Sequence, residues 1–419
     1  MAEFDLPYGK SHLTFHLPDE IAVQVIAPPE VGAAENPLSL VETALEQPLG
    51  VAGLDSFIGA RSVAIAINDK TRPVPHDLLL PPLLRRLEEL GIPPDRISLL
   101  IATGTHPVMP AEEYSQIIPM EIIQRYPVFC HDAKDQSSLV FLGQTSRGTP
   151  VWVNRQYLKA DVRIVVGNIE PHQFQGFSGG VKSAAIGLAG QITVNCNHAM
   201  MTDPNSRLGF YEGNPAREDV EEIGQYIGVH LALNAILNEH KQIVHVLAGE
   251  PRQVMKAGIP LARQICQVPV EGLFDLVIAS PGGHPKDINI YQAQKGLAHA
   301  ALVTRPGGTV ILAAACPEGS GSQSYEAWMR DIHSYEQVFT RFQQEGYRVG
   351  PHKAFQIARD AARVRLQFFS DMDMDFARAL LLNPINNLQS AIDQAVQALT
   401  RTGRVGILPR ASSTIPQVH

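Results

Sequence analysis

Three short apolar segments, each running into a polar loop, constrain the fold of this chain more than any other feature. Their sequences are SVAIAIND at 62–69, ISLLIATGTH at 97–106 and DVRIVVGNIEPH at 161–172. Such segments are typical of strands buried on both faces, and helical segments such as DLLLPPLLRRLEELG, which ends at Gly91, separate them. Buried strands that alternate with helices predict an α/β fold with a mainly parallel sheet rather than a β-sandwich.

The same alternation starts again in the C-terminal part of the chain. The segments FDLVIASPGGHP at 274–285 and GGTVILAAACPEG at 307–319 are each expected to form a strand followed by a loop. The region before them, about 203–269, is expected to be mostly helical, including EEIGQYIGVHLALNAILN. A length of 419 residues suits more than one domain, and we predict two α/β domains, residues 1–270 and 271–419, with an active-site cleft between them.

Composition excludes several classes of function. With 34 Lys and Arg against 42 Asp and Glu, the formal net charge of −8 argues against binding to nucleic acid or to an anionic membrane. The four cysteines are scattered without a CxxC pair, which fits a reducing compartment. The N-terminus lacks a basic and apolar leader, and no apolar run is long enough for a transmembrane helix, so we expect a cytoplasmic protein.

Polar residues of the kinds used in catalysis follow the three predicted strands. Asp69 and Arg72 follow the first strand, His106 the second and His172 the third. Ligands of open parallel sheets bind beyond the carboxyl ends of the strands, so these residues are expected to share one site. Each of them alone has an ordinary explanation, such as turn chemistry for Asp69 or a surface ion pair for Arg72. Their coincidence at three strand ends favours a functional site.

The glycine-rich segment GFSGGVKSAAIGLAG at 176–190 is a second candidate for ligand binding. Gly179 and Gly180 precede an apolar stretch, an arrangement that suits a loop holding an anion near a helix. Val181 separates Gly180 from Lys182, so the segment is not a P-loop and a nucleoside triphosphatase is not expected. Lys182 is either a solvated residue of a tight turn or a partly buried lysine, which would lose proton affinity and become nucleophilic.

Two further patterns suggest a metal and an acid substrate. His198, in VNCNHAMM, could complete a three-histidine zinc site with His106 and His172, and nickel also accepts imidazole ligands. Gln292 and Lys295 are three residues apart and would share one face of a helix. Together with an arginine they suit a small hydroxy- or keto-acid, although a lysine on a surface helix is the ordinary alternative.

Five of these segments, in this order, resemble the nickel-dependent lactate racemase family. They are DKTRP, ATGTH, PHQFQGFSGGVK, NCNH and YQAQK, which together span residues 69–295. The resemblance implies a racemase or epimerase of a 2-hydroxy acid that moves a hydride transiently from the α-carbon to a lysine-tethered nickel-pincer nucleotide. It also implies proteins that synthesise this cofactor as partners.

The resemblance assigns roles to residues of this chain. Lys182 would carry the nickel-pincer nucleotide covalently, near Gly179 and Gly180, and His198 would bind the nickel. His106 and His172 would be the two acid/base residues on opposite sides of the substrate carbon. The carboxylate and oxygen of the substrate would be held by Arg72, Gln292 and Lys295. Asp69 would orient this group or a histidine, and Tyr291 would pack near the cofactor ring.

The chain departs from the family pattern at a few positions, and two other functions stay open. Pro107 stands where an arginine is frequent, and Ile186-Gly187 stands where Pro-Gly is common, which leaves open whether lactate or a related hydroxy acid is the substrate. The alternatives are a zinc-dependent hydrolase with a three-histidine site and a non-catalytic protein that binds carboxylates or handles a cofactor.

Overall fold

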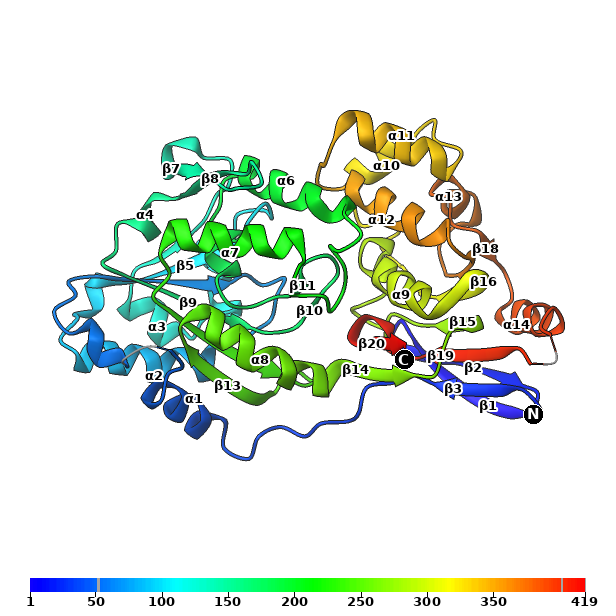
Figure 1. Ribbon diagram of the computed structural model, residues 1–419, viewed down its shortest axis with the longest axis horizontal. Coiled ribbons are helices and arrows are strands. Elements are labelled where there is room, and N and C mark those ends of the chain that lie inside the picture. The colour runs from blue at the N-terminus through cyan, green and yellow to red at the C-terminus, as the bar shows by residue number, and fades with distance from the viewer. Residues whose placement is uncertain (51–52, 401, 419) are drawn as a thin grey trace. The chain divides into compact units, whose positions relative to one another are not determined.

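The computed structural model describes residues 1–50, 53–400 and 402–418, which form two compact units. The central unit comprises Glu30–Ile265, and the terminal unit combines Met1–Pro29 with Cys266–His419. Both units are α/β, which confirms the predicted fold class (Figure 1). No helix in the described part of the chain has the length and hydrophobicity needed to cross a membrane.

A six-stranded sheet forms the middle of the central unit. Its strand order is β13-β12-β9-β4-β5-β6, and every neighbouring pair is parallel except β12 and β13. All residues of β4 are buried, as predicted for a strand covered on both faces. The strands are β4 (Val63–Asn68), β5 (Ile97–Ala102), β6 (Val128–Cys130), β9 (Val162–Asn168), β12 (Leu231–Leu237) and β13 (Ile243–Gly249).

Helices cover both faces of this sheet. Helices α1 (Pro37–Glu46) and α2 (His76–Glu89) pack on one face: Val41 and Leu45 of α1 and the buried leucines of α2 belong to one hydrophobic cluster with Ile65 and Ile67 of β4. The short helix α5 (Lys182–Ala185) contacts β4 and β9, and α7 (Pro215–Ile227) packs on α5. The remaining elements of the unit are α3 (Met120–Arg125), α4 (Arg155–Leu158), α6 (Gln191–Ala199), α8 (Pro251–Cys266) and the hairpins β7–β8 (Leu139–Gln144, Pro150–Asn154) and β10–β11 (Pro171–His172, Gly176–Phe177).

The terminal unit contains a second six-stranded sheet, which is parallel throughout. The strand order is β18-β17-β16-β15-β19-β3, and the hairpin of β1 and β2 packs on the sheet together with α14. The strands are β1 (Ala2–Tyr8), β2 (Ser11–Leu17), β3 (Ala22–Val25), β15 (Phe274–Ala279), β16 (Thr304–Ala313), β17 (Arg365–Phe369), β18 (Pro384–Ile385) and β19 (Arg404–Leu408), with a separate pair β14–β20 (Gln267–Val270, Ile415–Val418). The helices are α9 (Ile290–Val303), α10 (Gln323–Met329), α11 (Tyr335–Glu345), α12 (Pro351–Ala361), α13 (Met374–Ala379) and α14 (Leu388–Gln397).

Two sequence-based predictions differ from the structure. Residues 1–270 were expected to form one domain, but residues 1–29 belong to the terminal unit, because β3 pairs with β19 at the edge of its sheet. The region 203–269 was expected to be mostly helical, but it contains the strands β12 and β13 between α7 and α8. The terminal unit resumes at Cys266, close to the boundary expected near residue 270.

Candidate active site

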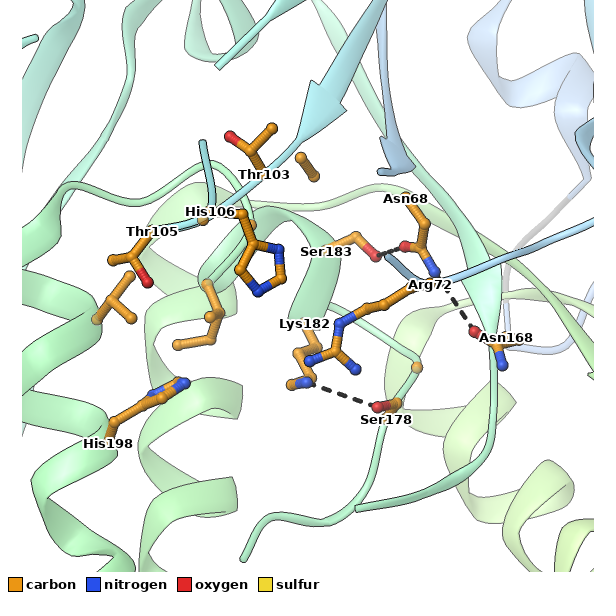
Figure 2. A pocket seen from close by; sticks show the side chains of 16 residues that line it. Asn68, Arg72, Thr103, Thr105, His106, Asn168, Ser178, Lys182, Ser183 and His198 are labelled. Atoms are coloured by element: carbon orange, nitrogen blue, oxygen red, sulfur yellow. Dashed lines mark hydrogen bonds between the residues drawn. The ribbon is translucent and has the colours of Figure 1, made fainter. Parts of the chain in front are cut away.

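A cavity lies at the carboxyl ends of the parallel strands of the central unit. β4 pairs with β9 on one side and with β5 on the other, so the loops that follow these strands meet at one edge of the sheet. The space of the cavity, open mouth included, is about 620 Å³. Figure 2 shows Arg72, His106, Lys182 and His198 directed into this space from separate segments of the chain. The structure thus brings together four of the residues singled out in the sequence.

Asp69 fixes the orientation of His106. Its carboxylate is 3% exposed, and Oδ2 lies 2.7 Å from His106 Nδ1. Oδ1 accepts hydrogen bonds from the backbone N–H of Thr71 at 3.1 Å and from its hydroxyl at 2.7 Å. Burial would raise the pKa of the Asp69 carboxyl, but the hydrogen bonds from His106 and Thr71 and the charge of Arg72 lower it below its usual range. The carboxylate therefore stays ionised and can only accept, so His106 carries its proton on Nδ1 and its lone pair on Nε2.

His172 is held in the opposite arrangement. It lies on β10, past the end of β9, and its Nδ1 accepts a hydrogen bond from the backbone N–H of Gln175 at 3.2 Å. This bond requires the lone pair on Nδ1, so the neutral ring carries its proton on Nε2. The ring of His172 lies edge-to-face on Phe174 with centroids 4.8 Å apart, and Phe174 packs in the same way on His198 at 5.0 Å. His172 therefore lies beside the cavity wall formed by His198.

Lys182 is buried at the start of α5. Its side chain is 8% exposed, and Nζ donates to Ser178 Oγ at 3.5 Å (Figure 2). Burial lowers the pKa of this amine well below its usual value, and the positive charges of Arg72 and Arg217 lower it further. A neutral amine has a lone pair, so Lys182 is suited to form a covalent bond to a ligand. The prediction of a buried lysine, rather than a solvated one, is confirmed.

The loop before Lys182 is shaped by its glycines. Gly179 has a φ of +100°, and a Cβ there would lie 2.7 Å from Ile169 Cγ1. Gly180 has a φ of +57°, and its N–H donates to Asn234 Oδ1 at 2.7 Å instead of facing the cavity. Gly179 lines the cavity, and Gly180 contributes through the close packing of the loop.

Buried asparagines at the strand ends support this loop, and the sequence analysis did not identify them. Asn68 ends β4 and Asn168 ends β9, and their side chains are joined by a hydrogen bond of 3.4 Å. Asn68 Oδ1 also accepts from Ser183 Oγ at 3.0 Å, next to Lys182 (Figure 2). A polar residue at the end of an otherwise apolar strand was the available signal, since SVAIAIN and VRIVVGN both end in asparagine.

His198 has the properties of a neutral metal ligand. It lies on α6, and burial together with the positive charges of Lys182, Arg72 and His106 lowers its pKa to about 3. Metal binding requires the neutral imidazole, which this environment maintains at physiological pH. Within the described residues, however, no group of three His, Cys, Asp or Glu side chains is arranged to hold a metal ion. This finding argues against the three-histidine zinc site, and a metal at His198 would need ligands from a bound cofactor.

Three of the predicted site residues lie in the terminal unit, on α9. Lys295 Nζ donates to Gln292 Oε1 at 2.8 Å, which confirms that the two share one helical face. Lys353 Nζ lies 4.5 Å from the ring centroid of Tyr291, and His352 packs edge-on against the same ring. Tyr291 is therefore held by buried neighbours on α12.

Comparison with known proteins shows similarity along nearly the whole chain. Residues 8–209 match the family model described as lactate racemase N-terminal domain, and residues 271–415 match lactate racemase C-terminal domain. Lactate racemase from Thermoanaerobacterium thermosaccharolyticum is 28% identical over 99% of both chains, and that from Lactiplantibacillus plantarum is 30% identical over 98% of both.

Solved structures give the same result. The lactate racemase apoprotein from Thermoanaerobacterium thermosaccharolyticum matches with a TM-score of 0.91 and 27% identity, covering 99% of this chain and 100% of that one. A crystal structure of a protein from Thermotoga maritima matches with a TM-score of 0.67 over 91% of this chain and 98% of that one. Its identity is 19%, so it supports the fold alone.

Proposed function

The chain belongs to the lactate racemase family and is an isomerase, and from this premise we propose that it interconverts the stereoisomers of a 2-hydroxy acid at the α-carbon. The observation that carries the proposal is the content of the cavity in the central unit. It combines a buried Lys182 whose pKa is well below its usual value, a neutral His198, the guanidinium of Arg72 and a His106 held by Asp69. A covalent anchor, a metal ligand, an anion-binding group and a base are the parts this reaction needs.

The carboxylate of the substrate is bound by Arg72 in this proposal. A guanidinium can donate two parallel hydrogen bonds to a carboxylate, which suits Arg72 for this role. Gln292 and Lys295 are proposed to bind substrate oxygens as well, and their mutual hydrogen bond holds the two polar groups together on α9. Lactate, the substrate named for the relatives, or a related hydroxy acid fits these requirements.

The residues of the cavity fit the nickel-pincer nucleotide. Lys182 would hold it covalently and His198 would bind its nickel, because burial lowers the pKa of both side chains and both line the same cavity. Gly179 would lie against it, and Tyr291 is proposed to pack near its ring. When bound, this group supplies an acceptor that takes the hydride of the α-carbon and returns it to either face.

The two histidines are proposed to move the hydroxyl proton. His106 has its lone pair on Nε2 and can take a proton there, while Asp69 keeps the ring in place through Nδ1. His172 serves the mirror-image substrate, and it must exchange its Nδ1 contact with the Gln175 N–H before Nε2 can act as a base. The planar keto acid formed in between has no handedness, so two bases on opposite sides give both enantiomers.

The proposal places this enzyme in the cytoplasm, together with the proteins that synthesise the cofactor. The four cysteines form no disulfide in the described structure, which is consistent with a reducing compartment. Loading by such proteins would make activity dependent on the host in which the chain is expressed.

The test is the intact mass of the denatured protein, isolated from a host that makes the cofactor, with peptide mapping around Lys182. We expect a stoichiometric adduct of nucleotide size on Lys182, its absence in Lys182→Ala, and racemisation of short 2-hydroxy acids only by the modified protein. An unmodified mass with full racemase activity would refute the covalent anchor. A correctly loaded enzyme that racemises no 2-hydroxy acid would refute the substrate class.

A further inference from the structure

A buried carboxylate, Asp219 on α7, lies behind His198 and has no part in the chemistry described so far. Its side chain is fully buried, at 0% exposure. Oδ1 accepts from Thr145 Oγ1 at 2.6 Å, and Oδ2 accepts from Thr149 Oγ1 at 3.0 Å and from Asn197 Nδ2 at 2.9 Å. All three donors are neutral groups. Burial of a carboxylate against neutral donors is costly, so its presence beside the residue that precedes His198 calls for a physical explanation.

The partners of Asn197 determine which way its amide faces. Nδ2 donates to the Asp219 carboxylate and to the carbonyl oxygen of Ala216 at 2.8 Å, and neither of these groups can donate in return. Oδ1 must therefore face the other way, where it accepts from Gln175 Nε2 at 2.8 Å and lies 3.1 Å from His198 Nδ1. A proton on His198 Nδ1 completes this contact, which puts the lone pair of the neutral ring on Nε2.

We propose that Asp219 and Asn197 are positioning residues that hold His198 as its Nδ1–H tautomer, with Nε2 as the metal-binding atom. The proposal rests on the proposed function, in which His198 binds nickel. Metal-binding histidines commonly donate their second ring N–H to a fixed acceptor, and loss of such a partner costs roughly 10- to 100-fold in metal affinity or activity. Here the acceptor is a neutral amide, and the carboxylate acts through it.

The same network reaches the hairpin that carries His172. Gln175 is 0% exposed, and while its side chain donates to Asn197 its backbone N–H donates to His172 Nδ1. The amide of Asn197 is therefore tied both to the proposed metal ligand and to the segment of one proposed acid/base residue. Removal of the Asn197 amide is expected to loosen both His198 and the hairpin that carries His172.

The experiment reads the tautomer of His198 in the protein without cofactor. Histidine is labelled with ¹⁵N, long-range ¹H–¹⁵N correlations show which ring nitrogen is protonated, and His198→Gln identifies the signal. In the unsubstituted protein we expect a proton on Nδ1. In Asn197→Ala we expect an Nε2–H population, because the acceptor for Nδ1–H is gone. Asp219→Asn keeps the shape and removes the charge, and we expect a smaller shift in the same direction.

The loaded enzyme supplies a second measurement, the rate of nickel loss to a chelator. We expect this rate to rise about 10- to 100-fold in Asn197→Ala and less in Asp219→Asn. The matched control is Thr149→Val, which removes one donor to Asp219 but leaves the Asp219–Asn197 contact, so tautomer and nickel retention should stay unchanged even where thermal stability falls.

Two outcomes would overturn the inference: a proton on Nε2 of His198 in the unsubstituted protein, or unchanged tautomer and nickel retention in both variants. The first outcome is measured in the unsubstituted protein, so it does not depend on whether a variant folds. Because the tautomer is read without cofactor, an enzyme that fails to acquire nickel or an adduct on Lys182 would count against the proposed function and leave this result standing.

Discussion

Replacement of Asp69 by asparagine should invert the tautomer of His106. Oδ1 of Asp69 accepts from the backbone N–H of Thr71, which can only donate, and Oδ2 faces His106 Nδ1 at 2.7 Å. In Asp69→Asn the amide oxygen therefore keeps the Thr71 side, and the amide NH₂ turns to His106. Nδ1 must then accept a hydrogen bond, so the proton moves to Nε2, the atom proposed to take the substrate proton.

The size of the effect follows from the loss of a general base. Such groups contribute about 10²- to 10⁴-fold, so the barrier should rise by roughly 3–5 kcal/mol. The assay is racemisation from each pure enantiomer, followed by chiral chromatography, on enzyme whose Lys182 adduct has been verified by mass. Thr71→Val is the matched control, because it removes one hydrogen bond to the carboxylate, worth about 0.5–1.5 kcal/mol, and leaves the carboxylate itself.

The reasoning fails if Asp69→Asn racemises at near-normal rates while His106 is shown to carry its proton on Nε2. That result would remove His106 as a base. A normal rate with the proton still on Nδ1 of His106 would instead show that the introduced amide has the opposite orientation. Its oxygen would then face His106, and its NH₂ group would face the Thr71 N–H, which cannot accept a hydrogen bond.

Three further predictions concern charge, packing and pH. Arg72→Gln should slow labelling of Lys182 by an amine reagent at neutral pH, because only burial and the charge of Arg217 then lower the pKa of the amine, whereas Arg72→Lys keeps the charge and should label normally. Gly187→Ala should cost about 1–3 kcal/mol in urea unfolding, since its Cβ would lie 2.5 Å from the Ser183 carbonyl oxygen; Gly32→Ala, with no atom within 4 Å, should be near neutral. The folded state lowers the pKa of His198 from 6.5 to about 3, so the unfolded chain binds the proton more tightly and stability should decline as pH falls from 6.5 towards 3. The urea midpoint of His198→Gln should decline less between pH 6.5 and 3 than that of the unsubstituted protein. An equal decline would contradict the lowered pKa of His198.

Local sequence patterns predicted the elements that build the site. β4, β5 and β9 are apolar runs of six or seven residues, and this short length together with their Val and Ile content favours strands buried on both faces over a buried helix. Because parallel strands share an edge, residues after separate strands could be placed together without knowledge of the strand order. Arg72 and His106 were found in this way.

The prediction from apolar patterns failed where an apolar segment is compatible with both a helix and a strand. The stretch VHLALNAILN was expected to continue a helix, but α7 ends at Gly228, whose φ of +68° terminates it, and Leu231–Leu237 forms β12. Its Leu and Ala residues favour a helix locally, and pairing with β9 overrides that preference. Similarly, nothing near Ala22–Val25 indicates that this strand pairs with β19 almost the whole chain length away.

The residues that orient the site were not predicted either, because their contacts also join parts of the chain that are distant in the sequence. Gln175 and Asp219 each contact Asn197 from 22 positions away. Gln175 and Asn197 fall within the segments PHQFQGFSGGVK and NCNH, but neither segment indicates that they are buried. Burial is a property of the folded chain, so a sequence can suggest which side chains do chemistry more readily than which ones orient them.

The charges of the cavity give a reason for the proposed covalent attachment at Lys182. The pKa values of Lys182 and His198 are lowered first by burial and then by positive neighbours, Arg72 among them. A substrate carboxylate bound to Arg72 would offset that positive charge and favour protonation of a free lysine, which would then pair with the substrate and compete with Arg72 for it. A Lys182 modified as proposed would not take up a proton in this way, so Arg72 would keep the substrate carboxylate. The site is therefore expected to bind hydroxy acids differently before and after modification of Lys182, with a pH-dependent affinity only for the unmodified protein, which isothermal titration of the two forms can measure.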